Sequence, residues 1–436
     1  MQNKRLTTIL GGRVAYRQRV VDDELDDLIQ QLPAIALEGA RGVGKTSTAE
    51  RRARTVYRLD DPAHRVVAEA DPSLVLAGKG PLLVDEWQRV PSVWDAVRRS
   101  VDRDSSPGRF LLTGSAGPKV PPTHSGAGRI ASLRMRPLSL LERGMGEPVV
   151  SLKRLMSGSP DSIEGTTAAR LADYVHEIVC SGFPGIRPLS GRALRVQLDG
   201  YLRSIIDVDL PEQGLTVRRP QLLERWLAAY AAATATTASF EAIRDAATGG
   251  QAEKPARATT IPYRETLERL WIADPVPAWT PSRNRLSRLG QPPKHHLVDP
   301  ALAVRMLGLD EDALLRGETA GETMRPDGAL LGRLFESLVT QSLRVYAQSA
   351  ECQVRHFRLH GGRREVDLIV ERGDQRALAI EVKLGGAVGA EDVRHLLWLR
   401  AQLGDDLVGA LVVYTGAHAF RRPDGIYVVP AAMLGP

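Results

Sequence analysis

The chain has 436 residues, of which 43% are hydrophobic and 25% are charged, and its net charge is +6. This composition is typical of a folded globular protein of two to four domains. No run of 18 or more strongly apolar residues occurs, so we expect no membrane-spanning helix, and the apolar N-terminal stretch is too short for a signal peptide. The two cysteines, Cys180 and Cys352, are too few for a disulfide framework, which favours reduced thiols in a cytoplasmic protein.

The positive charge is concentrated in the first third of the chain. Residues 1–145 carry 23 Lys and Arg against 17 Asp and Glu, whereas residues 146–325 and 326–436 are each neutral on balance. A basic excess is compatible with nucleic acid or with a polyanionic nucleotide as the partner. The overall charge is therefore only weak support for DNA binding by the later parts of the chain.

Short apolar runs alternate with helical patterns over the first 145 residues. The runs at 33–38, 80–86 and 109–115 each end in polar residues, and a helical pattern spans 46–54. Such continuous apolar runs are typical of buried parallel strands. We expect an α/β domain with a doubly wound parallel sheet.

A glycine-rich turn directly follows the first predicted strand and fits the pattern G-x-x-x-x-G-K-[ST] without a mismatch. Backbone N–H groups of such a loop surround phosphate oxygens, with the following helix N-terminus facing them. Lys45 would place its charge at the β- and γ-phosphates, and the Thr46 hydroxyl would coordinate Mg²⁺. The pattern predicts ATP and Mg²⁺ as cofactors, bound by Gly39, Ala40, Arg41, Gly42, Val43, Gly44, Lys45, Thr46 and Ser47.

Two carboxylates and two hydroxyls follow the next predicted strands. Asp85 could hold Mg²⁺ through water, and the adjacent Glu86 could polarise the water that attacks the phosphate. Thr113 and Ser115 end the neighbouring strand, where they could sense the γ-phosphate. This spacing predicts hydrolysis as well as binding.

These elements resemble the AAA+ ATPases, especially the bacterial and archaeal branch with a Leu-Leu-Thr-Gly-Ser strand and a later Gly-Arg pair. The resemblance implies that Arg129, after Gly128, acts on the γ-phosphate in cis or from a neighbouring subunit. The alternative is that Arg129, Arg134 and Arg136 form only a basic strand face.

The middle part, 146–325, has a different pattern. Residues 146–166 are rich in Gly, Pro and Ser and indicate a linker, and 167–245 are helical. A helix over 263–272 followed by a strand-like segment at 296–299 suggests a winged-helix module. A basic cluster lies in its predicted wing and is either a DNA-contacting loop, a solvated loop or a docking surface: Arg283, Arg285, Arg288, Lys294, His295 and His296.

The last part, 326–436, opens with a helix that carries Glu336. Strands are expected near 365–371, 377–383, 408–414 and 426–429. Three carboxylates on these elements, Glu336, Asp367 and Glu381, could bind divalent cations, and Lys383 could orient a water and offset charge on a phosphodiester.

This segment resembles the PD-(D/E)xK nuclease fold, with Val366 in place of the proline of that name. The same resemblance allows a nuclease that has lost its activity and serves as an interaction module. From about residue 14 to 430 the chain is similar to ATP-binding proteins with a DUF4143 region, which implies an AAA+ domain at 1–145, a helical and winged-helix-like region at 146–325 and a nuclease-like α/β domain at 326–436.

Three functions remain open from the sequence. The first is a Mg-ATP-hydrolysing ATPase that couples nucleotide state to the action of its C-terminal domain on nucleic acid. The second is an ATP-regulated Mg²⁺-dependent nuclease. The third is a non-catalytic switch that binds a partner protein, and a homo-oligomer is compatible with each of them.

Overall fold

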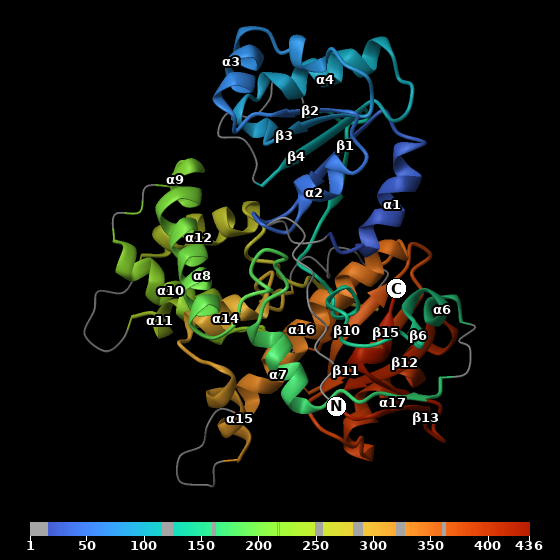
Figure 1. Cartoon of the computed structure of the whole chain (residues 1–436). Helices are drawn as coiled ribbons and strands as arrows, with labels where there is room; N and C mark the ends of the chain where they lie inside the picture. Colours follow the sequence, from blue (N-terminus) through green and yellow to red (C-terminus); the bar gives the residue numbers. More distant parts are fainter. Residues whose placement is uncertain are drawn as a thin grey trace, which may run out of the picture.

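Three regions make up the computed structural model of the chain (Figure 1). The structure describes residues 16–115, 125–158, 163–215, 217, 219–248, 256–281, 291–319, 328–359 and 363–436. Within this part of the chain, no helix is both long and apolar enough to cross a bilayer. Cys180 and Cys352 are both buried free thiols.

The N-terminal region is a five-stranded parallel sheet in the order β2-β3-β4-β1-β5. Its strands are β1 (Ala34–Glu38), β2 (Thr55–Arg58), β3 (Leu82–Asp85), β4 (Phe110–Gly114) and β5 (Ala131–Arg134). Its helices are α1 (Val20–Ile29), α2 (Lys45–Glu50), α3 (Pro62–Ala70), α4 (Ser92–Arg103) and α5 (Leu140–Arg143). The predicted parallel sheet is confirmed, and the central strands β3 and β4 are buried along their whole length because helices cover both faces.

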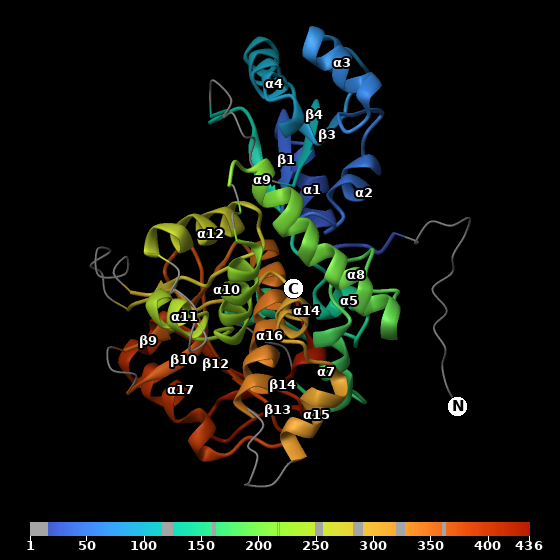
Figure 2. The ribbon, with the colours of Figure 1, turned by 90° about the vertical axis from the view of Figure 1, so that its left-hand side faces the viewer.

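The middle region is mainly helical and lies beside the N-terminal sheet (Figure 2). Its helices are α7 (Leu171–Val179), α8 (Gly191–Ser204), α9 (Leu210–Glu212), α10 (Pro220–Ala232), α11 (Phe240–Ala246), α12 (Arg257–Arg269), α14 (Pro300–Met306) and α15 (Glu311–Thr319). A π-helical turn, Ile205–Asp209, joins α8 to α9.

The C-terminal region is built on an eight-stranded mixed sheet in the order β7-β13-β14-β12-β11-β10-β9-β8. Its strands are β7 (Gly165–Thr166), β8 (Ala278–Trp279), β9 (Gln353–Arg358), β10 (Glu365–Glu371), β11 (Ala377–Lys383), β12 (Leu407–Tyr414), β13 (His418–Arg421) and β14 (Tyr427–Pro430). The helix α16 (Gly328–Ser349) packs against β9, β10 and β11, and α17 (Ala390–Leu403) packs against β10, β11 and β12. The four strands expected from the sequence are present.

The expectation of a linker over 146–166 is wrong. This segment contains β6 (Val150–Ser151), α6 (Leu152–Ser157) and β7. β6 pairs with β15 (Leu434–Gly435) and β7 pairs with β13, so the segment is part of the C-terminal region. The apolar side chains of Leu152, Leu155 and Met156 pack into the core. The prediction of a linker relied on the Gly, Pro and Ser content of the segment and overlooked these three residues.

The predicted hairpin of a winged helix is reduced to two isolated bridges, Ala273 with Leu297 and Val276 with Lys294. The strand next to it, β8, pairs instead with β9 of the C-terminal sheet. The middle and C-terminal regions are therefore joined by continuous strand pairing. The winged-helix and nuclease-like classes both stay predictions.

Candidate nucleotide site and C-terminal carboxylate cluster

The phosphate loop lies at the carboxyl end of β1 and leads directly into α2, whose first residue is Lys45. Gly39, Gly42 and Gly44 all have positive φ angles, of 150°, 83° and 103°. A Cβ atom on Gly39 would lie 2.2 Å from the Met135 carbonyl oxygen. Only glycine fits this turn, because a side chain would collide with the backbone and strain the left-handed conformation.

Lys45 is 5% exposed, and its ammonium donates hydrogen bonds to two loop carbonyls, Gly39 O at 2.7 Å and Ala40 O at 2.9 Å. Burial lowers its pKa to about 8, against the opposing attraction of Glu86 and Asp85. The hydrogen bonds of the ammonium thus go to neutral loop oxygens, with Glu86 and Asp85 acting on it only through their charge. An incoming phosphate is the anion that its position suits.

Asp85 receives hydroxyl groups from the phosphate loop and from β4. Thr46 Oγ1 donates to Asp85 Oδ1 at 2.8 Å, and Thr113 Oγ1 donates to the same oxygen. The structure therefore brings together three residues predicted separately from the sequence. A carboxylate and a hydroxyl in contact form a donor set that fits Mg²⁺, which prefers oxygen ligands.

Glu86 follows β3 with a φ angle of 56°, which is unusual for a residue with a side chain. Its Oε2 accepts hydrogen bonds from Gln88 Nε2 at 2.5 Å and from Ser115 Oγ at 3.3 Å. The strained backbone turns Glu86 toward Ser115, so both residues lie at the carboxyl edge of the sheet. Strain of this kind is common at functional sites.

The remaining loop residues differ in exposure. Ala40 and Val43 are fully buried, so they contribute backbone atoms rather than side chains to the loop, whereas Ser47 is exposed on α2. Arg41 points to the middle region, where its Nη1 pairs with Asp209 Oδ1 at 2.8 Å. The Arg41 carbonyl oxygen accepts a hydrogen bond from Tyr201 Oη at 3.0 Å.

Asp209 lies on the π-helical turn after α8, and sequence reasoning did not assign it to the site. A π-helical segment inside a longer helix is frequently functional, yet its position has no clear sequence signal. Phe183 also approaches the loop beside Gly42 and stacks obliquely on Tyr201, with ring centroids 4.9 Å apart. The middle region therefore contacts the phosphate loop through both backbone and side chains.

A cavity of about 550 Å³ lies between the sheet edge and α12. Its walls include Glu38 at the end of β1, Gly114 at the end of β4, and Glu268 and Trp271 of the middle region. The middle region thus forms one side of the space next to the nucleotide site.

Arg129 lies near the amino ends of the strands, whereas the phosphate loop lies at their carboxyl ends. It precedes β5, whose first residue, Ala131, pairs with Ile35 near the start of β1, whereas the phosphate loop follows the end of that strand. Its Nε pairs with Asp102 Oδ1 of α4 at 2.8 Å, and its side chain is partly exposed. In one copy of the chain, Arg129 does not meet the phosphate loop.

Arg134 and Arg136 are not an exposed basic face. Both pair with Asp274 of the middle region at 3.0 Å, and Arg344 of α16 pairs with the same carboxylate at 2.7 Å. Burial of Asp274 is outweighed by the three guanidinium groups, which hold its pKa well below the usual range. This cluster joins all three regions.

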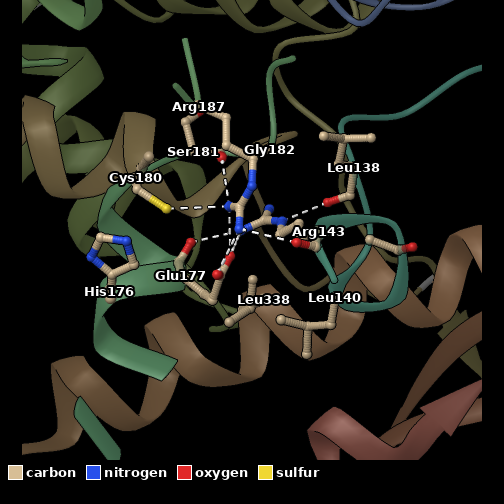
Figure 3. A network of polar contacts seen from close by, with 12 residues as sticks. Leu138, Leu140, Arg143, His176, Glu177, Cys180, Ser181, Gly182, Arg187 and Leu338 are labelled. Carbon is tan, nitrogen blue, oxygen red and sulfur yellow. Dashed lines mark hydrogen bonds and ion pairs between the residues drawn. The ribbon is translucent and has the colours of Figure 1, made fainter. Parts of the chain in front are cut away.

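A second junction surrounds Glu177 of α7 (Figure 3). Arg187 donates to both oxygens of Glu177 at 2.7 Å. Arg143, at the end of α5, donates to the Glu177 carbonyl oxygen at 2.6 Å and to Gln341 of α16 at 3.0 Å. The N-terminal region is therefore fixed to both other regions by buried, charge-assisted hydrogen bonds.

The C-terminal carboxylates gather in the interior of the mixed sheet, near the start of β10 and the end of β11. Leu368 of β10 pairs with Ile380 of β11, so Asp367 and Glu381 occupy the next position along this antiparallel pair. Glu336 approaches them from α16. Lys383 Nζ pairs with Glu381 Oε1 at 3.0 Å, which brings all four predicted residues into one neighbourhood.

A fifth residue lies inside this group. The ammonium of Lys294, from the middle region, is 2.8 Å from Glu336 Oε1, 3.3 Å from Asp367 Oδ1 and 3.5 Å from Glu365 Oε1. Among the described residues, no group of three or more His, Cys, Asp or Glu side chains is arranged as a metal site. With Lys294 in this position, the carboxylates do not fit a divalent cation.

Of the three alternatives for the basic cluster, a DNA-contacting loop and a solvated loop are both wrong for Lys294, His295 and His296, because these residues are 1%, 1% and 2% exposed. Their basic character suggested a surface wing, but the flanking apolar segment carries them into the interior. Arg283, Arg285 and Arg288 lie outside the described residues. A single lysine between buried elements gave no sequence signal that it pairs with carboxylates 42 to 73 residues away.

A parallel sheet with a phosphate loop after β1 and an Asp-Glu pair at the end of β3 is typical of P-loop nucleotide-binding domains. In agreement, the AAA domain family matches residues 31–143. A domain of unknown function, DUF8612, matches 171–313, and another, DUF4143, matches 331–434. The expected AAA domain and DUF4143 region are thus confirmed.

The chain is 24% identical over 416 residues to uncharacterized protein Rv2008c of Mycobacterium tuberculosis, an alignment that covers 93% of this chain and 82% of that protein. Uncharacterized protein Mb2031c of Mycobacterium bovis is similar to the same extent. A RuvB variant of Thermotoga maritima aligns with 62% of this chain and 94% of its own, with 17% identity and a TM-score of 0.26, which is too low to carry an argument about function.

Proposed function

We propose that the chain binds Mg-ATP and hydrolyses it, and that its middle region responds to the nucleotide state. The observation that carries this proposal is Lys45, a buried ammonium that is hydrogen-bonded to loop carbonyls beside the Thr46–Asp85–Thr113 cluster. A structural lysine would be paired with a carboxylate, whereas one that awaits phosphate need not be.

Each residue has a role that follows from its position. The phosphate loop orients the triphosphate, and Lys45 supplies charge at the β- and γ-phosphates. Thr46 and Asp85 would hold Mg²⁺, which supplies charge neutralisation when bound. Glu86, aligned by Gln88 and Ser115, orients and polarises the attacking water.

The test of this proposal measures ATP binding and ATP turnover separately. The full chain is assayed for ATP binding by calorimetry and for phosphate release, alongside Glu86→Gln and the exposed control Glu69→Gln. Glu86→Gln should bind ATP like the wild type and lose at least about 100-fold in turnover. Hydrolysis by Glu86→Gln at the wild-type rate would contradict the catalytic assignment.

The response of the middle region is supported by the Arg41–Asp209 pair. A bound triphosphate would compete with Asp209 for the Arg41 guanidinium, since both are anions that contact the same loop. Loss of this ion pair would free the turn after α8, while Tyr201 of α8 itself contacts the loop at the Arg41 carbonyl oxygen. Nucleotide binding is in this way linked to the helices that lead toward the C-terminal region.

Arg129 would act only across a contact between two copies, because its own phosphate loop lies at the other ends of the strands. Light scattering with and without ATP tests this part of the proposal, with Arg129→Ala as the variant. An ATP-dependent increase in mass, together with slower turnover of Arg129→Ala, would support it. A monomer with unchanged turnover in the variant would exclude it.

A further inference from the structure

The C-terminal carboxylate cluster already contains a cation. Lys294 Nζ lies within 3.5 Å of oxygens from Glu336, Asp367 and Glu365, and it also approaches the Asp367 carbonyl oxygen at 3.4 Å. Burial alone would lower the pKa of Lys294, but the three carboxylates outweigh it and raise the pKa above its usual range. The group is therefore a stable ammonium in the interior.

The backbone around Lys294 is fixed on both sides. Its N–H and C=O exchange hydrogen bonds with Val276 at 2.9 Å in each direction. The next residue, His295, donates its N–H to Thr236 O at 2.8 Å and accepts from Ala235 N–H at 2.7 Å. Lys294 thus enters the cluster as an anchored part of the middle region rather than as a loose side chain.

Glu381 provides the cluster with an oxygen that has no hydrogen-bond partner. This carboxylate is 8% exposed, and its Oε2 atom is buried without a hydrogen-bond partner, while Oε1 is paired with Lys383. A buried carboxylate oxygen without a partner is costly. Glu336, Asp367 and Glu381 are the kind of oxygen ligands that a hard divalent cation prefers. Lys294 pairs with the first two of them, and one oxygen of Glu381 has no partner.

We propose that Lys294 is a built-in cation that takes the place of a divalent metal ion among Glu336, Asp367 and Glu381, and that its removal creates a divalent-cation site. In the structure described, the C-terminal domain therefore holds its carboxylates through a lysine of another region. A metal ion and the Lys294 ammonium compete for the same oxygens, because both cannot lie within 3.5 Å of them without strong repulsion. This inference does not depend on ATP hydrolysis.

Binding of Mn²⁺ to the nucleotide-free full chain tests the proposal by electron paramagnetic resonance titration. Lys294→Met keeps the length of the side chain and removes its charge. We expect Lys294→Met to gain a Mn²⁺ site at least tenfold tighter than any in the wild type, and Lys294→Met combined with Asp367→Asn to lose it. Lys294→Arg, which retains a cation, should resemble the wild type, as should the exposed control Lys153→Met.

Two results would overturn the proposal. One is Mn²⁺ binding by the wild type that disappears in Asp367→Asn, because the site would then be open with Lys294 in place. The other is a folded Lys294→Met, checked by circular dichroism, that gains no site. Should Lys294→Met fail to fold, the comparison of wild type with Asp367→Asn still decides, since absence of Asp367-dependent binding is the required result.

Discussion

Two buried lysines, Lys45 and Lys294, lie beside acidic residues in different regions and differ in the groups that accept their hydrogen bonds. The Lys45 ammonium donates hydrogen bonds to two neutral carbonyls, and burial lowers its pKa to about 8 despite the nearby Glu86 and Asp85. Lys294 bonds to carboxylates, which raise its pKa. The partners of a buried ammonium, rather than its burial, therefore distinguish a site that can accept an anion from one whose charge is already neutralised.

The largest effect is expected from Lys45→Met. Its removal deletes the charge at the phosphates, so we expect at least about a 100-fold loss of ATP affinity and no measurable turnover. The free energy of unfolding should change by no more than about 1 kcal/mol, because the loss of two hydrogen bonds to carbonyls is offset by the removal of a buried charge. Calorimetry and urea denaturation measure the two effects, with Lys79→Met as the exposed control.

Lys294→Met is expected to change stability strongly and ATP affinity very little. It leaves buried carboxylates without a counter-charge, which should lower the free energy of unfolding by about 3 kcal/mol in the absence of divalent cations. ATP affinity should stay within about twofold of the wild type, since Lys294 contacts the other site nowhere. A loss of stability below about 1 kcal/mol in urea denaturation would remove the contrast between the two lysines.

The sequence predicts the first of these environments well and the second poorly, for a physical reason. The phosphate loop is a local motif, so the roles of Gly39 to Thr46 follow from eight consecutive residues whose backbone geometry is demanding. The strands of the C-terminal sheet also follow from local apolar patterns. Lys294 meets its partners only after two regions fold together, and its basic neighbours suggested an exposed DNA-binding wing instead.

The same distinction applies to the junctions between regions. Asp209 and Asp274 pair with arginines 168 and 138 residues away, and Glu177 pairs with Arg143, 34 residues away. Nothing in the local sequence around these carboxylates selects those partners. Pairing across regions depends on tertiary geometry, which motif spacing does not encode.

A third prediction concerns pH and Lys45. Because its pKa is lowered to about 8, the free protein loses this charge as pH rises past 8, and bound phosphates would restore it. ATP binding then takes up a proton, so affinity should fall by about tenfold between pH 7.5 and 9. Titration calorimetry at several pH values measures this, and Lys45→Arg, which stays charged, should show a much flatter profile. An equally steep profile in Lys45→Arg would assign the titration to another group.

The smallest effect is expected at the contact between the phosphate loop and the middle region, where Arg41 pairs with Asp209. Asp209→Asn keeps the shape of the side chain but weakens its pairing with Arg41, which is partly exposed, so the expected cost in stability is at most about 1 kcal/mol. Because Asp209 and the triphosphate compete for Arg41, the variant should bind ATP about two- to fivefold more tightly. Asp199→Asn, which weakens an ion pair between α8 and Arg305 of α14, is the matched control and should leave ATP affinity unchanged. Weaker ATP binding by Asp209→Asn would instead show that this carboxylate positions Arg41 for the phosphates, and the middle region would then support the nucleotide site rather than compete with it.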